Sequence, residues 1–202
     1  MWIFVGLGNP GVAFKNTRHN IGWRAVEVFA KRKNLDWEGR NSLVYALGDK
    51  FVLVKPITFM NLSGKAVRQA MEMWGQDPEK LIILHDDIDL PLGKVKIKFG
   101  GGTAGHRGLE SVIYEIGTSQ FGRIRMGINI GYKPAKLADF VLQEFSEEEM
   151  KIVECSIDRA CEAMELIMEE GFEKAMSIIN GEKPCSFQQE GAEKPKGGIN
   201  GN

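Results

Sequence analysis

The 202-residue sequence lacks several features that would assign it to a common class of protein. No apolar run approaches the roughly 20 residues that a membrane-spanning helix needs. The N-terminal "MWIFVGL" has neither a charged segment nor a cleavage site, so we expect no signal peptide. No serine or cysteine sits in a G-x-S-x-G or comparable setting, which disfavours a covalent nucleophile.

Cysteine is scarce, with only Cys155, Cys161 and Cys185. An odd number without C-x-x-C spacing favours reduced thiols in a cytosolic setting. Cys155 and Cys161 are expected to pack in the core from a helix, where cysteine behaves as a small apolar residue.

The net charge of −1 conceals a strong asymmetry along the chain. Residues 91–136 hold eight Lys or Arg against two acids, whereas residues 137–175 hold three against twelve. A local basic field attracts polyanions whatever the net charge. The basic segment is therefore compatible with a nucleic-acid partner, although a solvated basic face alone is the commoner explanation.

Periodicity predicts an α/β protein. Apolar or alternating runs predict strands near 2–6, 43–47, 51–55, 80–85, 94–98 and 123–129. Helical spacing predicts helices over about 20–34, 63–75, 106–116, 146–170 and 172–180. The alternation of strands and helices predicts a single three-layer domain over residues 1–181, with a twisted mixed β-sheet flanked by helices.

Local signals refine this scheme. Gly48-Asp49 predicts an antiparallel hairpin, and Ser146 with Glu149 predicts a capping box at the start of the long helix. Ser63 is a candidate cap for its own helix. Residues 182–202 are rich in Gly, Pro, Glu and Lys, so we expect a disordered C-terminal tail there.

Gly6, Gly8 and Gly11 spell G-x-G-x-x-G after the first strand, the pattern of a dinucleotide-binding loop. Such a loop needs its helix to begin inside the motif, at the pyrophosphate. Here helical spacing starts only near Asn20, so the motif is interpreted as a coincidence of turn glycines. An NADP site that uses Arg32 remains a minor alternative.

The three histidines, His19, His85 and His106, each stand where a loop is expected to meet a strand end or a helix start. One hypothesis is a zinc site completed by an acid, for which the candidates are Asp86, Asp87 and Asp89. No histidine or cysteine spacing typical of metal ligands supports it.

The other hypothesis is general-base hydrolysis. An imidazole can remove a proton from water while a carboxylate fixes its tautomer, and His19 with Asp86 could form that pair. The side-chain amides of Asn9 and Asn61 could donate hydrogen bonds to a developing oxyanion.

Five segments together have a more specific signature. They are "VGLGNPG", "TRHNIG", "PITFMNLSGKAV", "HDDIDLPLGKVKIKFGGGTAGHRGLES" and "FGRIRMGI". In this order, from about residue 3 to about residue 180, the chain resembles the bacterial-type peptidyl-tRNA hydrolase family. The resemblance implies a monomeric, cytoplasmic enzyme without metal or cofactor. Such an enzyme hydrolyses the ester between peptide and tRNA and so recycles tRNA from stalled or released peptidyl-tRNA.

The resemblance also implies roles for single residues. His19 matches the base that activates water, and Asp86 matches the carboxylate that keeps it basic. Asn9 matches the residue that senses the peptide side, and Asn61 matches the amide that binds substrate and orients the water or the carbonyl.

Further positions match binding residues of the family. Phe59 and Met60 match the wall of the channel for the tRNA end and the peptide. Gly105 and His106 match the glycine loop that borders the peptide cleft. The helix that follows is expected to offer its free N-terminus to an anion.

Two basic positions, Lys98 and Arg125, match residues that grip tRNA phosphates. Two other substrate-binding positions depart from the common pattern: Phe14 replaces a Tyr and Arg107 replaces an Asn. A phenyl ring can still stack on an adenine, but a guanidinium cannot accept a hydrogen bond as an amide does. The rival reading is a catalytically silent RNA-binding protein, which would not need the His19–Asp86 pair.

Overall fold

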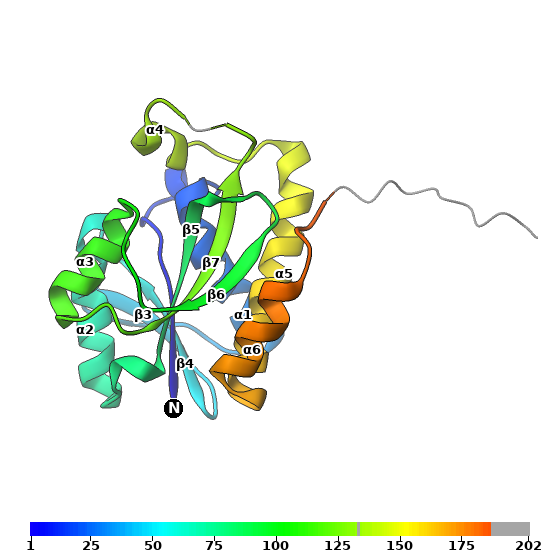
Figure 1. Ribbon diagram of the computed structural model, residues 1–202. Coiled ribbons are helices and arrows are strands. Elements are labelled where there is room, and N and C mark those ends of the chain that lie inside the picture. The colour runs from blue at the N-terminus through cyan, green and yellow to red at the C-terminus, as the bar shows by residue number, and fades with distance from the viewer. Residues whose placement is uncertain (133, 187–202) are drawn as a thin grey trace, which may run out of the picture.

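The computed structural model describes residues 1–132 and 134–186. Within them one seven-stranded sheet lies between two layers of helices (Figure 1). The strands are β1 (Trp2–Gly6), β2 (Glu38–Arg40), β3 (Leu43–Leu47), β4 (Phe51–Pro56), β5 (Leu81–Pro91), β6 (Val95–Phe99) and β7 (Gly122–Asn129). Their order across the sheet is β2-β3-β4-β1-β5-β7-β6.

The helices cover both faces of the sheet. They are α1 (Ile21–Arg32), α2 (Ser63–Trp74), α3 (Arg107–Ile116), α4 (Leu137–Val141), α5 (Glu147–Glu170) and α6 (Phe172–Gly181). Single 3-10 turns are η1 (Val12–Phe14), η2 (Arg18–Asn20), η3 (Met60–Leu62) and η4 (Pro78–Lys80). Helices α2 and α3 pack on one face and α1, α5 and α6 on the other (Figure 1), so the predicted three-layer fold is confirmed.

The sheet is mixed. The central strands β4, β1, β5 and β7 run parallel, whereas the pairs β2–β3, β3–β4 and β6–β7 towards the two edges are antiparallel. The predicted hairpin is confirmed as β3–β4. Sequence patterns missed β2 and α4, which have only three and five residues and therefore too little length to show a period.

The long helix α5 behaves as its sequence predicts. Ser146 and Glu149 form the capping box. The apolar stripe of α5 faces the sheet, with Val153, Ile157 and Met164 buried in the core. Cys161 lies in the same stripe, where burial raises the pKa of its thiol to about 12.

The remaining two cysteines overturn the expectation of reduced thiols. Cys155, on the outer side of α5, is bonded to Cys185 in a disulfide. Cys155 therefore does not pack in the core. The pairing joins residues 30 positions apart, and only the return of the chain after α6 along α5 brings them together.

The same contact corrects the start of the predicted tail. Residues 182–186 belong to the described chain and lie against it: the Cys185 amide donates to the Gly93 carbonyl at 2.9 Å, and Arg159 donates to the Lys183 carbonyl at 2.6 Å. Packed chain thus continues past Gly181. The rest of the predicted tail, residues 187–202, lies outside the described residues.

Close packing explains two of the three glycines in the G-x-G-x-x-G pattern. A Cβ on Gly6 would lie 2.3 Å from the carbonyl oxygen of Gly22 in α1, and one on Gly8 would lie 2.5 Å from the Trp23 ring. Gly11 alone has a positive φ, at 110°. The interpretation as turn glycines therefore holds only for Gly11. Since α1 begins at Ile21, no helix starts inside the motif, which removes the basis of the dinucleotide reading.

Within residues 1–132 and 134–186, no helix is long and apolar enough to cross a bilayer.

The contact between α1 and the sheet predicts the effect of one added methyl group. A Cβ on Gly22 would lie 2.3 Å from the carbonyl oxygen of Leu84, which is rigid backbone. We expect Gly22→Ala to destabilise the protein by about 1–3 kcal/mol in urea unfolding, because α1 must move away from β5.

The control is Gly181→Ala at the end of α6, where an added Cβ meets nothing within 4 Å. It should be neutral or slightly stabilising because alanine favours helix. Equal unfolding midpoints for the two variants would contradict the proposed close contact.

Candidate active site

A cavity of about 490 Å³ opens at the carboxyl ends of the parallel strands. There β1 ends at Gly6, while β5 continues and pairs only with β7 from His85 onward. The sequence predicted that His85 and Asp86 end a strand, but both lie inside β5. What ends beside them is β1, so their side chains still reach the edge where ligands bind in α/β sheets.

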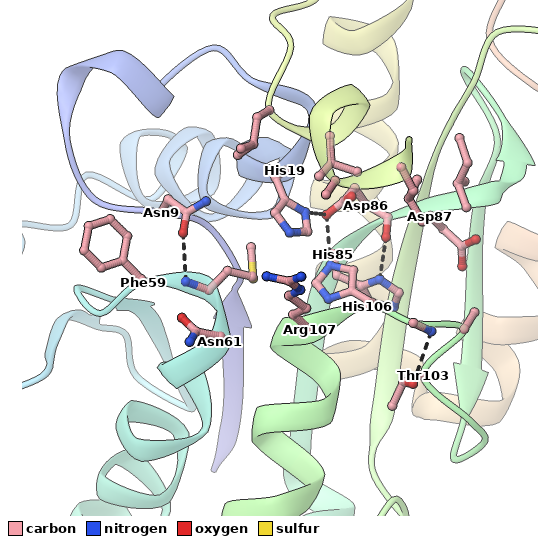
Figure 2. A pocket seen from close by; sticks show the side chains of 18 of the residues that line it. Asn9, His19, Phe59, Asn61, His85, Asp86, Asp87, Thr103, His106 and Arg107 are labelled. Atoms are coloured by element: carbon pink, nitrogen blue, oxygen red, sulfur yellow. Dashed lines mark hydrogen bonds and ion pairs between the residues drawn. The ribbon is translucent and has the colours of Figure 1, made fainter. Parts of the chain in front are cut away.

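His19 and Asp86 form the predicted pair. The Nδ1 atom of His19 lies 2.8 Å from Oδ1 of Asp86, and the Asp86 side chain is only 2% exposed (Figure 2). Burial alone would raise the pKa of Asp86, but the adjacent His19 and His106 lower it below its usual range. Asp86 is therefore a carboxylate that accepts from Nδ1–H of His19, which leaves the lone pair of His19 on Nε2.

His106 binds the same carboxylate oxygen. Its Nε2 atom lies 3.0 Å from Oδ1 of Asp86, and its ring centre lies 4.8 Å from that of His19. Its Nδ1 atom accepts from the amides of Gly108 and Leu109 at 3.1 and 3.3 Å. His106 thus caps α3, and the prediction that the N-terminus of α3 is free to bind an anion is wrong.

Asn9 ties the first loop to the loop after β4. Its Oδ1 accepts from the Met60 amide at 2.8 Å, which leaves the two N–H groups of the side-chain amide free to donate (Figure 2). Asn20, to which no role was predicted, holds the backbone of Asn9 from both sides, at 2.9 Å each. The only sequence signal for Asn20 was its place in the polar triplet that contains His19.

Asn61 and two aromatic rings line the mouth of the cavity. Asn61 lies in η3, is exposed and lines the cavity. Phe14 and Phe59 meet edge to face with ring centres 6.4 Å apart, and Phe59 is 57% exposed. Ser63 is the first residue of α2 and does not cap it, contrary to prediction.

Arg18 anchors the turn that carries His19. Its guanidinium donates to both carboxylate oxygens of Glu149 in α5, at 2.9 and 3.0 Å. It also lies 4.4 Å and 4.8 Å from the ring centres of Phe140 and Phe145. A buried arginine held on three sides fixes η2, a role that the sequence did not reveal.

The glycine loop after β6 is held from beneath by Arg123, whose guanidinium donates to the carbonyls of Gly101 and Gly102 at 2.6 and 2.5 Å. Gly105 lines the cavity with φ at 78°, a conformation that favours glycine. Arg107 lies just beyond, exposed, and points into the cavity between Asn61 and His106 (Figure 2). It is the single arginine or lysine among the described residues that line this cavity.

The basic segment forms a surface on β6 and β7. Lys98 is opposite Arg123 and Lys96 is opposite Arg125, so these four side chains share one face of the strand pair. Lys98 is exposed and, within the described chain, has no ion pair. Arg125 donates to Oδ2 of Asp87 at 2.7 Å, so its charge is partly balanced.

The far wall of the cavity is apolar, and sequence reasoning missed it. Helix α4 and the residue after it contribute Leu137, Ala138, Val141 and Leu142. Helix α4 has only five residues, too few to show a helical period, so the sequence did not predict this apolar side of the cavity.

The positions of the histidines and acids also bear on the zinc hypothesis, because three of the proposed ligands lie together. The candidate ligand atoms of His19, Asp86 and His106 lie within 4.8 Å of one another, and this is the one such group in the described chain. His85 and Asp87 are not members of it. Hydrogen bonds already account for the clustered atoms, so the chemistry of the group does not require a metal ion.

The fold and site define an α/β enzyme with an imidazole–carboxylate pair in an open cavity. The family model described as peptidyl-tRNA hydrolase matches residues 3–187. The peptidyl-tRNA hydrolase of Pseudothermotoga lettingae is 42% identical over 89% of this chain and 97% of its own. That of Bacillus cytotoxicus is 40% identical over 89% of this chain and 100% of its own.

Solved structures agree with the sequence comparisons. A crystal structure of the peptidyl-tRNA hydrolase of Acinetobacter baumannii is 30% identical to this chain, with a TM-score of 0.85. The match covers 92% of this chain and 97% of that one. The chain belongs to the peptidyl-tRNA hydrolase family, which confirms the resemblance.

The buried His85 makes the free energy of unfolding depend on pH. Burial, with the nearby His106, lowers the pKa of His85 from 6.5 to about 3. Between these values the unfolded chain binds a proton that the folded protein does not, so stability falls as pH drops below 6.5. The carboxylate of Asp86, whose pKa is lowered, contributes stability that is lost only in more acidic solution.

We therefore expect His85→Asn to flatten the dependence of unfolding free energy on pH between about 7 and 5, measured by urea unfolding. Its absolute stability can be lower at every pH without affecting this test. A slope equal to that of the unaltered protein would exclude His85 as the source.

Proposed function

We propose that His19, oriented by Asp86, is the general base with which this enzyme hydrolyses the ester between peptide and tRNA. We assign the activity to the domain of residues 1–181. The observation that carries the proposal is the 2.8 Å contact between His19 and a buried Asp86 at an open cavity, in a chain of this family. Hydrolysis returns free tRNA from peptidyl-tRNA that has stalled or been released during translation.

The reaction needs one proton transfer before the carbon–oxygen bond breaks. Nε2 of His19 takes a proton from water, and the resulting hydroxide attacks the ester carbonyl. Asp86 stabilises the imidazolium that forms. The tetrahedral oxyanion then collapses, the bond to the ribose oxygen breaks, and that oxygen takes up a proton.

Amides stabilise the charge on the carbonyl oxygen. The Met60 amide donates to the side-chain oxygen of Asn9, so the side-chain N–H groups of Asn9 remain available to the substrate. Asn61 supplies a second amide from η3. A neutral donor favours the oxyanion over the ground-state carbonyl without binding other anions strongly. Asn9 also recognises the peptide side of a blocked substrate.

The two ends of the substrate occupy different walls. The exposed ring of Phe59 and the half-buried ring of Phe14 stack on the terminal adenine, since stacking is worth about 1–3 kcal/mol per base. Met60 and Gly105 border the channel, and Arg107 contacts the substrate near Asn61. The apolar wall of α4 faces the peptide.

Lys98 and Arg125 hold the tRNA backbone. They line a second cavity of about 220 Å³ beside the glycine loop, together with His85 and Asp87. Phosphate binding there supplies affinity that is independent of sequence and sensitive to salt.

The enzyme is proposed to act as a monomer in the cytoplasm, where its tRNA substrate is used. We propose no cofactor, metal or membrane partner, because water, base and amide donors together complete the chemistry.

Replacing His19 tests the mechanism. We expect His19→Ala to lower kcat by at least about 100-fold on an N-blocked aminoacyl-tRNA, because the general base is lost. The measurement is release of the acyl group, with unfolding checked in parallel.

A chelator is the second arm of this test, and it should leave the rate of the unaltered enzyme unchanged. An intact rate for His19→Ala would overturn the base assignment. Loss of activity in chelator, restored by added zinc, would favour the metal site instead.

The tRNA surface predicts a change in salt dependence. Lys98→Ala should weaken binding of uncharged tRNA and reduce the slope of log K against log salt by about one, because one phosphate contact is lost. Arg125→Ala should have a smaller effect, since Asp87 already neutralises part of its charge. Lys50→Ala, in the exposed β3–β4 turn at the other end of the sheet, is the matched control. Identical slopes for Lys98→Ala and Lys50→Ala would exclude the proposed surface.

A further inference from the structure

A single oxygen atom of Asp86 serves two imidazoles. Oδ1 lies 2.8 Å from Nδ1 of His19 and 3.0 Å from Nε2 of His106. All three side chains are at most 10% exposed. Two donors on one oxygen share its negative charge, so a change in either hydrogen bond alters the other.

The start of α3 determines which nitrogen of His106 carries the proton. Two backbone amides, of Gly108 and Leu109, donate to Nδ1 of His106. An atom that accepts these bonds carries no hydrogen, so the neutral ring bears its hydrogen on Nε2, which faces Asp86. Protonation of Nδ1 would remove the cap of α3 and place a cation at the positive end of a helix.

The other charged groups around the three side chains leave this role to His106. Asp87 is paired with Arg125, and Arg18 with Glu149. His85 donates from Nδ1 to the Asp86 carbonyl at 2.7 Å, and its lowered pKa keeps it neutral near pH 7.

Two arginines complete these surroundings. Arg123 donates to the glycine loop. Arg107 lines the cavity without an ion pair in the described chain. Helix α4 presents only apolar side chains to this cavity.

We propose that His106 is a positioning residue that sets the basicity of His19 through their shared oxygen on Asp86. By donating to Oδ1 it holds the carboxylate in the orientation that His19 needs. It also takes part of the negative charge that would otherwise stabilise protonated His19 and keep the base occupied. The inference rests on the proposed base role of His19. It assigns His106 to the catalytic pair rather than to the border of the peptide cleft.

Two substitutions separate the two hydrogen bonds of His106. In His106→Asn the amide oxygen takes the place of Nδ1 and can cap α3, but nothing reaches Asp86. In His106→Gln the amide nitrogen takes the place of Nε2 and can donate to Asp86, while the cap is weakened. Steady-state kinetics on an N-blocked aminoacyl-tRNA are measured across pH for both variants, with urea unfolding of each.

For His106→Asn we expect near-normal stability and a kcat lowered by about tenfold, with KM within about twofold. The acidic limb of its pH–rate profile should move to higher pH, because Asp86 then shares its charge with His19 alone. His106→Gln should recover much of kcat and the original profile despite a lower stability. In the unaltered protein, nitrogen NMR of the imidazoles should show His106 protonated at Nε2.

Three results would overturn the inference. One is an unshifted pH–rate profile for His106→Asn. Another is a rise of KM alone in both variants, which would leave His106 as a wall of the peptide cleft. The third is a His106 ring protonated at Nδ1.

The proposed function fails separately, if His19→Ala retains its rate. A lost rate for His19→Ala together with an unshifted His106→Asn profile would remove only the role of His106.

Discussion

The carboxylate of Asp86 is the point on which the site depends. It is buried, it remains charged because His19 and His106 both donate to it, and it joins three separate segments of the chain. Burying a charged group away from water is costly unless hydrogen bonds compensate. Both histidines are therefore placed where they can donate to the buried carboxylate of Asp86. Strand β5 supplies this anion just past the end of β1, where the cavity opens.

The loops around the cavity are held by polar side chains that take no part in the proposed reaction. Arg18 fixes the turn of His19 against α5, and Arg123 supports the glycine loop. Asn20 fixes the backbone of Asn9, which in turn binds the Met60 amide. A water, a base and an ester must meet within fractions of an ångström, and loops alone are too mobile for this without such anchors.

Two errors in the sequence-based predictions share one physical origin. The disulfide between Cys155 and Cys185 and the close approach of Gly22 to Gly6 both depend on contacts between distant segments. Spacing rules describe neighbours on one helix or strand, so they cannot register such contacts. Short elements such as β2 and α4 escaped for a different reason, since they are too brief to show a period.

Local patterns in the sequence were sufficient for the mixed α/β layers, the β3–β4 hairpin and the capping box of α5, and family motifs were sufficient for the pairing of His19 with Asp86. Each depends on periodicity, local hydrogen bonding or a motif that can be read along the chain. Only the tertiary structure decided that His106 shares the carboxylate, that Arg125 is partly neutralised and that Arg107 enters the cavity. Those outcomes depend on which atoms compete for the same partner in space, and this competition begins only when the chain has folded.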